Sequence, residues 1–359
     1  MNVCASLRPA LASFAAFGLG ACIPGQGVTY ETTPGRYSPV LAGTPESSFD
    51  SGGPIRPALF VANKRGNSIS KIDLETGEEI VRRDSCTNPH ELATSPQGNL
   101  VALACYGGTT VDLFDTRELA LVASIGLGEN ARPHGIVWGQ NDTIYVTTEG
   151  RGSIVQIRDP ASFMRRIREY PTGQQGSHML AIAPDWRTAW TVDLESNTVT
   201  RLDLSEQEPP RSVKIGEQPE GIALSIDATT LWVSARGSDM AFALDPETLA
   251  VRSMVRTGRF PLRLAIRPQG DVAITSNLRD GSLSVIDLDT TRLIRKIDVS
   301  SPDEAQERAQ VTILWADDGE RIYVAETASN TVAEVDYASG QVLRRLATGE
   351  GGDGLAIVP

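Results

Sequence analysis

Seven segments of this chain repeat one pattern, and such a repeat constrains the fold more than any other feature of the sequence. Each segment has a short apolar stretch, a polar turn rich in Gly, Asn or Ser, and a second stretch that alternates and ends near an Asp, as in LFVANKRGNSISKIDL and IYVAETASNTVAEVD. The anchor positions of the repeats, 41–50 residues apart, are Val61, Leu103, Val146, Thr191, Val233, Ile274 and Val324. This period is typical of architectures in which every repeat is one supersecondary unit.

Each repeat continues into a third and a fourth stretch of the same kind, such as QVLRRL and DGLAIVP. Period-two alternation, β-branched residues and turns about every 8–12 residues indicate β-strands throughout. Four strands within about 40–45 residues form one blade of a β-propeller. The sequence therefore predicts an all-β, seven-bladed β-propeller over residues 55–359, with four antiparallel strands per blade. Residues 58–84 supply three strands and residues 353–359 one, so we expect the two termini to share the first blade.

The phrases LWVSARGSD and LDPETLAV, together with PEGIALSID, resemble the YVTN-type seven-bladed β-propeller repeat family. The resemblance extends over residues 58–359 and implies a propeller fold. It implies no single activity, because that family includes many binding proteins and some enzymes, and a fold hosts many functions.

The first 21 residues have the features of a secretion signal. An apolar run follows Arg8 and is shorter than the roughly 20 residues that span a bilayer. The run ends in LGAC, residues 19–22, which resembles the bacterial lipobox and implies that Cys22 carries lipid. An ordinary signal that leaves Cys22 free is the alternative. Residue 23 is Ile and not Asp, which in Gram-negative lipoproteins implies sorting to the outer membrane.

Residues 22–54 are rich in Pro, Gly, Ser and Thr and lack an apolar period, so we interpret them as the lipidated cysteine and a flexible tether. The net charge of −12 argues against nucleic-acid binding, which needs a basic face. It also disfavours docking on an anionic membrane, so we expect membrane contact only through the lipid. We therefore predict a cell-envelope protein, an outer-membrane lipoprotein that faces the periplasm or the cell surface, and we expect a monomer.

All three histidines of the chain occupy one position of the repeat, the first residue after the loop that leads into the innermost strand. At this position the blades carry Asp353, His90, His134, His178, Glu220, Leu262 and Val311 in ring order. Imidazoles flanked by carboxylates suit a divalent transition metal such as zinc or copper. We predict a metal site at the mouth of the central channel, held by His90, His134, His178, Glu220 and Asp353, with an apolar opposite arc. The alternatives are that these side chains line a wet channel or that the imidazoles, once protonated, bind an anion.

Two further predictions concern residues next to this column. Asp193 ends the strand beside the one that begins at His178, so we expect its carboxylate to orient that imidazole. Cys86 and Cys105 are the two cysteines of the predicted propeller, and in an oxidising compartment we expect them to form a disulfide. Ligation of a metal by Cys105 is the alternative.

Two functions follow from this interpretation. The first is a binding or scaffold protein that presents its upper loops to an envelope protein or a cell-wall component. The second is implied by the family resemblance: a metal-dependent hydrolase or lyase, lactonase-like or similar to streptogramin lyase, that uses the histidines. Binding stands first because the sequence contains no complete catalytic motif.

Overall fold

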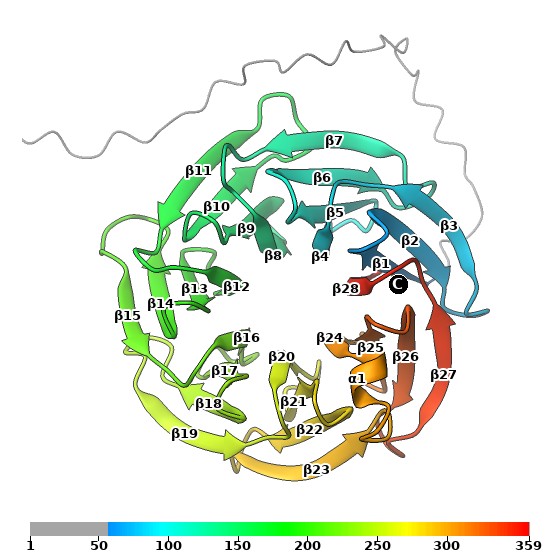
Figure 1. Cartoon of the computed structure of the whole chain (residues 1–359). Helices are drawn as coiled ribbons and strands as arrows, with labels where there is room; N and C mark the ends of the chain where they lie inside the picture. The colour runs from blue at the N-terminus through cyan, green and yellow to red at the C-terminus, as the bar shows by residue number, and fades with distance from the viewer. Residues whose placement is uncertain (1–56, 359) are drawn as a thin grey trace, which may run out of the picture.

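Seven four-stranded antiparallel sheets are arranged around one axis, and each sheet is one blade of a ring (Figure 1). The computed structural model describes residues 57–358; the predicted signal (1–21) and the predicted tether with Cys22 (22–54) lie outside the described residues. The architecture confirms the predicted all-β, seven-bladed propeller. Within the described range, no helix is long and apolar enough to cross a membrane.

The strands fall into four sets by their distance from the axis. The innermost are β28 (Gly352–Val358), β4 (Pro89–Thr94), β8 (Pro133–Gly139), β12 (Ser177–Ile182), β16 (Pro219–Leu224), β20 (Pro261–Ile266) and β24 (Gln310–Trp315). The second strands are β1 (Ala58–Asn63), β5 (Leu100–Cys105), β9 (Thr143–Thr148), β13 (Thr188–Asp193), β17 (Leu231–Ala235), β21 (Val272–Asn277) and β25 (Arg321–Glu326). The third are β2 (Ser68–Asp73), β6 (Thr110–Asp115), β10 (Ser153–Arg158), β14 (Thr198–Asp203), β18 (Met240–Leu244), β22 (Ser282–Asp287) and β26 (Thr331–Asp336). The outermost are β3 (Glu79–Asp84), β7 (Leu121–Gly126), β11 (Arg166–Pro171), β15 (Arg211–Lys214), β19 (Val251–Arg256), β23 (Arg292–Asp298) and β27 (Val342–Ala347).

The first blade closes the ring with strands from both ends of the chain, as predicted. Strand β28 pairs with β1 in antiparallel register, Ala58 opposite Val358 and Asn63 opposite Gly352. The C-terminus therefore lies beside the first described strands (Figure 1). This pairing gives both inner strands of the blade a hydrogen-bonded neighbour, which removes exposed edges at the point of closure.

The core is divided among the contacts between neighbouring blades. The described residues form seven apolar clusters, and each one joins side chains from two adjacent blades. The second strands are buried along their length because both faces of each blade pack against another blade, whereas the outer strands alternate toward solvent. Each blade thus depends on its two neighbours, and the ring positions the inner strands for the site.

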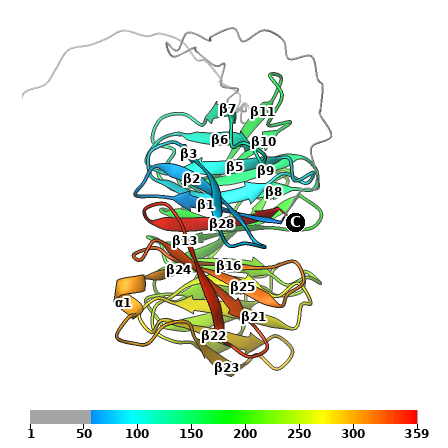
Figure 2. The same ribbon diagram turned by 90° about the vertical axis from the view of Figure 1, so that its right-hand side faces the viewer.

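One helical turn, α1 (Ala305–Arg308), lies in the connection that leads from β23 to β24. This connection enters β24 at the end where every inner strand begins. In the side view α1 stands out on one face of the ring (Figure 2). We call this the entry face, and the starts of the inner strands, where the histidines lie, belong to it.

Candidate metal centre

The three histidines follow the first residue of three neighbouring inner strands, β4, β8 and β12. At this point the ladder slips: Pro89 pairs with Cys105, but the next pair is Leu92 with Leu103. A register shift of this kind opens all seven inner strands. A β-bulge re-aims the side chain of its extra residue, so the shared position directs the histidines toward the axis instead of the packing between blades.

The imidazoles form a row around the axis. Ring centroids are 4.8 Å apart for His90 and His134, and 3.8 Å apart for His134 and His178. Asp353 Oδ2 lies 4.0 Å from His90 Nε2 at one end of the row. Glu220 Oε1 lies 3.6 Å from His178 Nε2 at the other. The five residues singled out by the sequence are therefore neighbours, but they extend along an arc and do not converge on one point.

A residue that the sequence analysis missed completes the metal-capable part of this row. His178 Nδ1 and Glu149 Oε2 are 2.7 Å apart. His134, Glu149 and His178 each offer one ligand atom, and these atoms all lie within 4.8 Å of one another. This set shares His134 and His178 with the predicted one and adds Glu149, while His90, Glu220 and Asp353 lie beside it along the row.

Glu220 and Asp353, the two carboxylates of the predicted ligand set, both form ion pairs with cationic side chains. Arg263 Nη1 lies 2.7 Å from Glu220 Oε1, and its Nη2 lies 2.6 Å from Glu91 Oε1, across the axis. Lys64 Nζ lies 2.9 Å from Asp353 Oδ2. The expectation of an apolar arc opposite the histidines was therefore wrong in one respect: Leu262 is buried, but the next residue, Arg263, bridges two carboxylates at the axis. We refer to His90, His134, His178, Glu91, Glu149, Glu220, Arg263 and Asp353 as the axial cluster.

Asp193 has a structural role, and the expectation that it orients His178 was wrong. Its carboxylate is buried inside the fourth blade and accepts hydrogen bonds from four hydroxyl groups. The donors and distances are Ser177 Oγ at 2.7 Å, Thr191 Oγ1 at 2.9 Å, Thr198 Oγ1 at 2.9 Å and Thr200 Oγ1 at 2.6 Å. We call this group the hydroxyl cage. Glu149, from the neighbouring blade, takes the position beside His178 instead.

Four residues that the repeat pattern did not indicate share one position in the chain, directly after the second strand of a blade. Lys64, Tyr106, Glu149 and Arg236 all occupy it, and each contacts the axial cluster. Successive side chains of a strand point to opposite faces. The last residue of the strand, such as Asp193, is bonded within its own blade, whereas the following residue belongs to the turn at the entry face and contacts the axial cluster. The position that bonds within the blade and the position that contacts the axial cluster are therefore consecutive residues of the chain.

Tyr106 and Arg132 cover the site from the entry face. The Tyr106 hydroxyl donates to Glu149 Oε1 at 2.7 Å, and the Tyr106 ring packs 4.4 Å from the His90 ring, centroid to centroid. Arg132 lies over the Tyr106 ring and 3.2 Å from Glu149 Oε1. The Glu149 carboxylate is thus held in place by two groups on the side away from His178.

The electrostatic surroundings shift the pKa values of the residues in the axial cluster in different directions. Burial lowers the pKa of His134 well below its ordinary value, and the neighbouring imidazoles lower it further. Burial also disfavours the charged form of His178, but hydrogen bonds with Glu149 and Glu220 outweigh it and raise the pKa. Burial alone would raise the pKa of Glu220, yet the hydrogen bond with His178 and the charges of His178 and Arg263 lower it to about 2. His134 is therefore neutral at physiological pH, with an unprotonated ring nitrogen.

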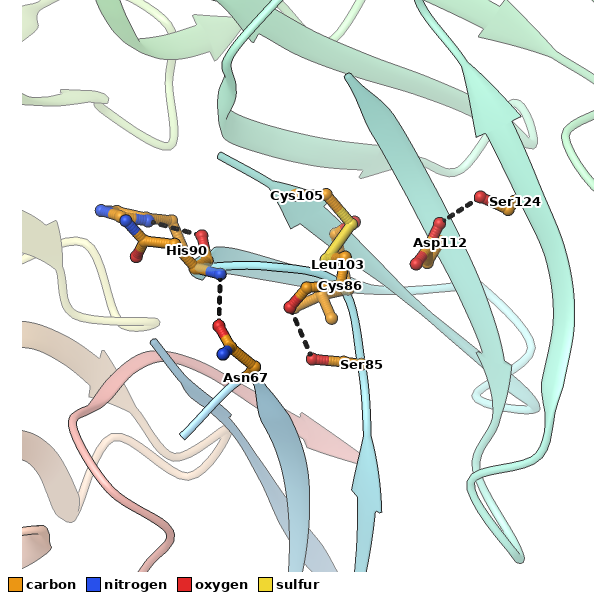
Figure 3. Close-up of a disulfide and its surroundings, with 9 residues drawn as sticks. Asn67, Ser85, Cys86, His90, Leu103, Cys105, Asp112 and Ser124 are labelled. Atoms are coloured by element: carbon orange, nitrogen blue, oxygen red, sulfur yellow. Dashed lines mark hydrogen bonds between the residues drawn. A yellow bond between two sulfur atoms is a disulfide. The ribbon is translucent and has the colours of Figure 1, made fainter. Parts of the chain in front are cut away.

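Cys86 and Cys105 form a disulfide, with Cα atoms 5.7 Å apart, close to the strand that carries His90 (Figure 3). Asp112 lies near the sulfurs, but its carboxylate accepts a hydrogen bond from Ser124 at 2.5 Å. Disulfide sulfurs carry no thiolate charge for a metal. The disulfide therefore links the β3–β4 connection to β5. Cys86, Cys105 and Asp112 do not form a ligand set for a metal.

Comparison with known families decides the class of the chain. The model of the family described as "Lactonase, 7-bladed beta-propeller" matches residues 59–300, about two thirds of the chain. The chain belongs to the seven-bladed lactonase β-propeller family. The match begins at the first described strand and includes all three histidines.

Individual relatives of this lactonase-family propeller are distant. Antigen Lp49 of Leptospira interrogans is 21% identical over 65% of this chain, which spans 45% of that protein's length. A solved putative 6-phosphogluconolactonase from Bacteroides fragilis is 15% identical, covers 87% of this chain and 99% of its own, and has a TM-score of 0.67. A streptogramin B lyase structure is 13% identical, covers 72% of this chain and 82% of its own, and has a TM-score of 0.61. At such identities the solved structures show a shared fold only.

Proposed function

We propose that this lactonase-family propeller is an envelope binding protein that holds a divalent transition metal at His134, His178 and Glu149. One observation carries the proposal: the Nδ1 atom of His134 is buried and has no hydrogen-bond partner among the described residues. Leaving a buried polar atom unpaired costs about 1–3 kcal/mol. A cation bonded to this nitrogen would remove that cost, because neutral imidazole is the form that ligates metals.

The donor set fits zinc best. Two imidazole nitrogens and one carboxylate oxygen are ligand types that zinc takes, with bonds of about 2.0–2.2 Å; copper is the next candidate. Two ligands on opposite sides of one ion are therefore at most roughly 4.2 Å apart. The three atoms lie within 4.8 Å of one another, so small rotations of the side chains bring them into range. The hydrogen bond from Tyr106 to Glu149 would orient the carboxylate, as outer partners of metal ligands do.

Burial favours an ion over a larger ligand. His134 is 2% exposed and His178 8% exposed, and the Arg263 bridge to Glu91 fills the axis beside them. An ion fits between these side chains without displacing the bridge, whereas a sugar-sized substrate requires the cluster to open. For this reason we place binding ahead of catalysis.

The test is zinc affinity measured by isothermal titration calorimetry and equilibrium dialysis on protein purified without a histidine tag. We expect His134→Ala and Glu149→Gln to weaken zinc binding by about 10–100-fold or more. His90→Ala is the matched control, since it removes an imidazole from the same column but outside the set, and should change affinity less than about threefold. Wild-type protein that retains no zinc would refute the metal site. A loss of zinc affinity in His90→Ala equal to that in His134→Ala would show that the proposed ligand set names the wrong residues.

A metal-dependent hydrolase or lyase is the second candidate. Two histidines and one glutamate leave a coordination position open for water, as catalytic zinc sites do. Membership of the lactonase family supports this alternative. Hydrolysis of a simple lactone, followed in a pH-stat with zinc-loaded protein, discriminates between the two functions. Activity that disappears in Glu149→Gln would favour the enzyme, and a zinc-loaded protein without activity would favour binding.

The proposed location follows from the lipobox-like LGAC at residues 19–22. With lipid on Cys22, the domain would be held at the outer membrane, and the loops of the entry face would be presented to an envelope protein or a cell-wall component. The YVTN-type repeats agree with such a binding role. Cys22→Ala should move the protein from the membrane fraction to the soluble fraction, and unchanged fractionation would remove the anchor from this proposal.

A further inference from the structure

The connection between β10 and β11, residues 159–165, presents two adjacent apolar side chains to solvent. Phe163 is 101% exposed and Met164 83% exposed, whereas the other exposed large apolar residues are 40–61% exposed. In both views the connection beside β11 extends beyond the rim of the ring (Figures 1 and 2). These two side chains contribute nothing to the core, so folding does not explain their presence.

The backbone of this connection is held in a turn that displays the pair. Ser162 Oγ accepts a hydrogen bond from the Met164 amide at 3.0 Å, and the Ser162 amide donates to the Asp159 carbonyl at 2.9 Å. Arg165 Nε donates to the Pro160 carbonyl at 3.1 Å. The apolar tip is therefore a shaped feature of the loop.

Arginines flank the tip, in contrast to the acidic chain as a whole. The basic residues of this segment are Arg158, Arg165, Arg166 and Arg168. Two of them make exposed ion pairs: Arg166 with Asp159 at 3.4 Å, and Arg168 with Glu206. Exposed pairs contribute about 0–1 kcal/mol, so these arginines can exchange their partners for lipid phosphates. The net charge of −12 disfavours membrane docking in general, but this segment reverses the sign locally.

We propose that Phe163 and Met164 insert into the interface of an anionic lipid bilayer while the flanking arginines contact its headgroups. An apolar tip with basic neighbours is the combination that binds such interfaces, because burial of apolar area and attraction to anionic lipid act together. Arginine suits the boundary because its apolar stem is buried while its guanidinium stays among the phosphates. The contact adds to the predicted lipid on Cys22 and depends neither on that lipid nor on the metal site.

The position of the tip orients the ring. Thr148 and Ser153 pair at the turn between β9 and β10, which lies at the entry face beside Glu149. Arg158 pairs with Thr143 at the other end of the same strands. The connection that follows Arg158 therefore lies on the face opposite the axial cluster. Insertion of the tip keeps the entry face, with the histidines, directed toward the aqueous phase.

The experiment measures co-sedimentation of the full chain carrying Cys22→Ala with vesicles of phosphatidylglycerol and phosphatidylethanolamine, up to about 10 mM lipid. We expect binding, and we expect Phe163→Ser with Met164→Ser to weaken it by about tenfold or more, since each side chain loses its transfer into an apolar phase. The matched control is Leu121→Ser with Val122→Ser, an exposed apolar pair on β7 of the neighbouring blade, which should change binding less than twofold.

Arg165→Gln with Arg166→Gln should weaken binding to these anionic vesicles and leave binding to phosphatidylcholine vesicles unchanged. Circular dichroism checks that every variant is folded. Absence of binding by the Cys22→Ala chain at the highest lipid concentration overturns the proposal. Equal losses for the tip pair and the β7 pair overturn it as well, because they show that exposed apolar area in general, and not this tip, binds the lipid.

Discussion

Two buried carboxylates of neighbouring blades, Asp193 in the hydroxyl cage and Glu220 in the axial cluster, show how surroundings decide what a residue does. Asp193 is 0% exposed and accepts hydrogen bonds from neutral hydroxyl groups. Glu220 is 4% exposed and lies between Arg263, Arg236 and His178. Burial raises the pKa of Asp193, and the hydroxyl groups offset this only in part. The cations around Glu220 reverse the effect of burial and lower its pKa to about 2.

A buried acid therefore indicates a candidate site only when its partners are charged or titratable. The hydroxyl cage joins three strands of one blade, β12, β13 and β14, and its donors are neutral hydroxyl groups. The axial cluster joins side chains from several blades and contains an imidazole nitrogen without a partner among the described residues. Three predictions test this contrast between the two carboxylates.

The largest effect is expected for Arg263→Met, which breaks the axial cluster. The substitution leaves Glu91 and Glu220 buried without their shared cation, and removal of one partner from a buried ion pair costs about 3–5 kcal/mol. Urea denaturation measures the loss. The triple variant Arg263→Met, Glu91→Gln, Glu220→Gln is the control, since it removes the carboxylate charges and should recover most of the stability. A triple variant as unstable as the single one would show that Arg263 acts through packing.

Acidification should act in opposite directions on the two carboxylates. The folded-state pKa of Glu220 lies below its ordinary value of 4.5, so its contribution to stability is present above about pH 4.5 and is lost as the pH falls toward 2. That contribution amounts to at most about 3 kcal/mol. The raised pKa of Asp193 has the opposite sign, because its burial penalty is relieved as the carboxyl takes up a proton. His178, with a raised pKa, adds stability below about pH 6.5 that is lost as the pH rises through its folded-state value.

Denaturation at a series of pH values in metal-free buffer separates these contributions. Glu220→Gln should make stability less sensitive to acid between about pH 5 and pH 2, and Asp193→Asn should make it more sensitive. The same response from both variants would contradict the assignment of opposite pKa shifts.

The smallest effect is expected for Asp193→Asn at neutral pH, about 1–2 kcal/mol of stability. The amide keeps one acceptor oxygen for the hydroxyl donors, but its NH₂ group requires some of them to turn and accept. Zinc affinity per folded molecule should stay the same, because the hydroxyl cage does not contact the proposed ligands. Loss of zinc binding in this variant without loss of stability would place Asp193 in the metal site after all.

The repeat pattern predicted some features of the structure correctly and others not. The repeat period predicted the blades, the shared first blade and the position of the histidines, because alternation along a strand determines which side chains share a face. The same reasoning placed Asp193 beside His178, but Glu149 takes that position, and it lies one residue beyond the second strand of the preceding blade. The pattern did not indicate Arg263, because the repeat marks only the position of Leu262, whereas the bulge brings the following residue to the axis as well.

The repeat pattern alone was sufficient to predict a seven-bladed propeller whose three histidines meet at one end of the axis. Both properties follow from periodicity, which is a local feature repeated along the chain. The pairing of side chains is visible only in the folded ring: Glu149 pairs with His178 from the next blade, and Arg263 pairs with Glu91, 172 residues away. Contacts between blades and across the axis depend on the radius of the closed ring and on side-chain length, and the repeat pattern encodes neither.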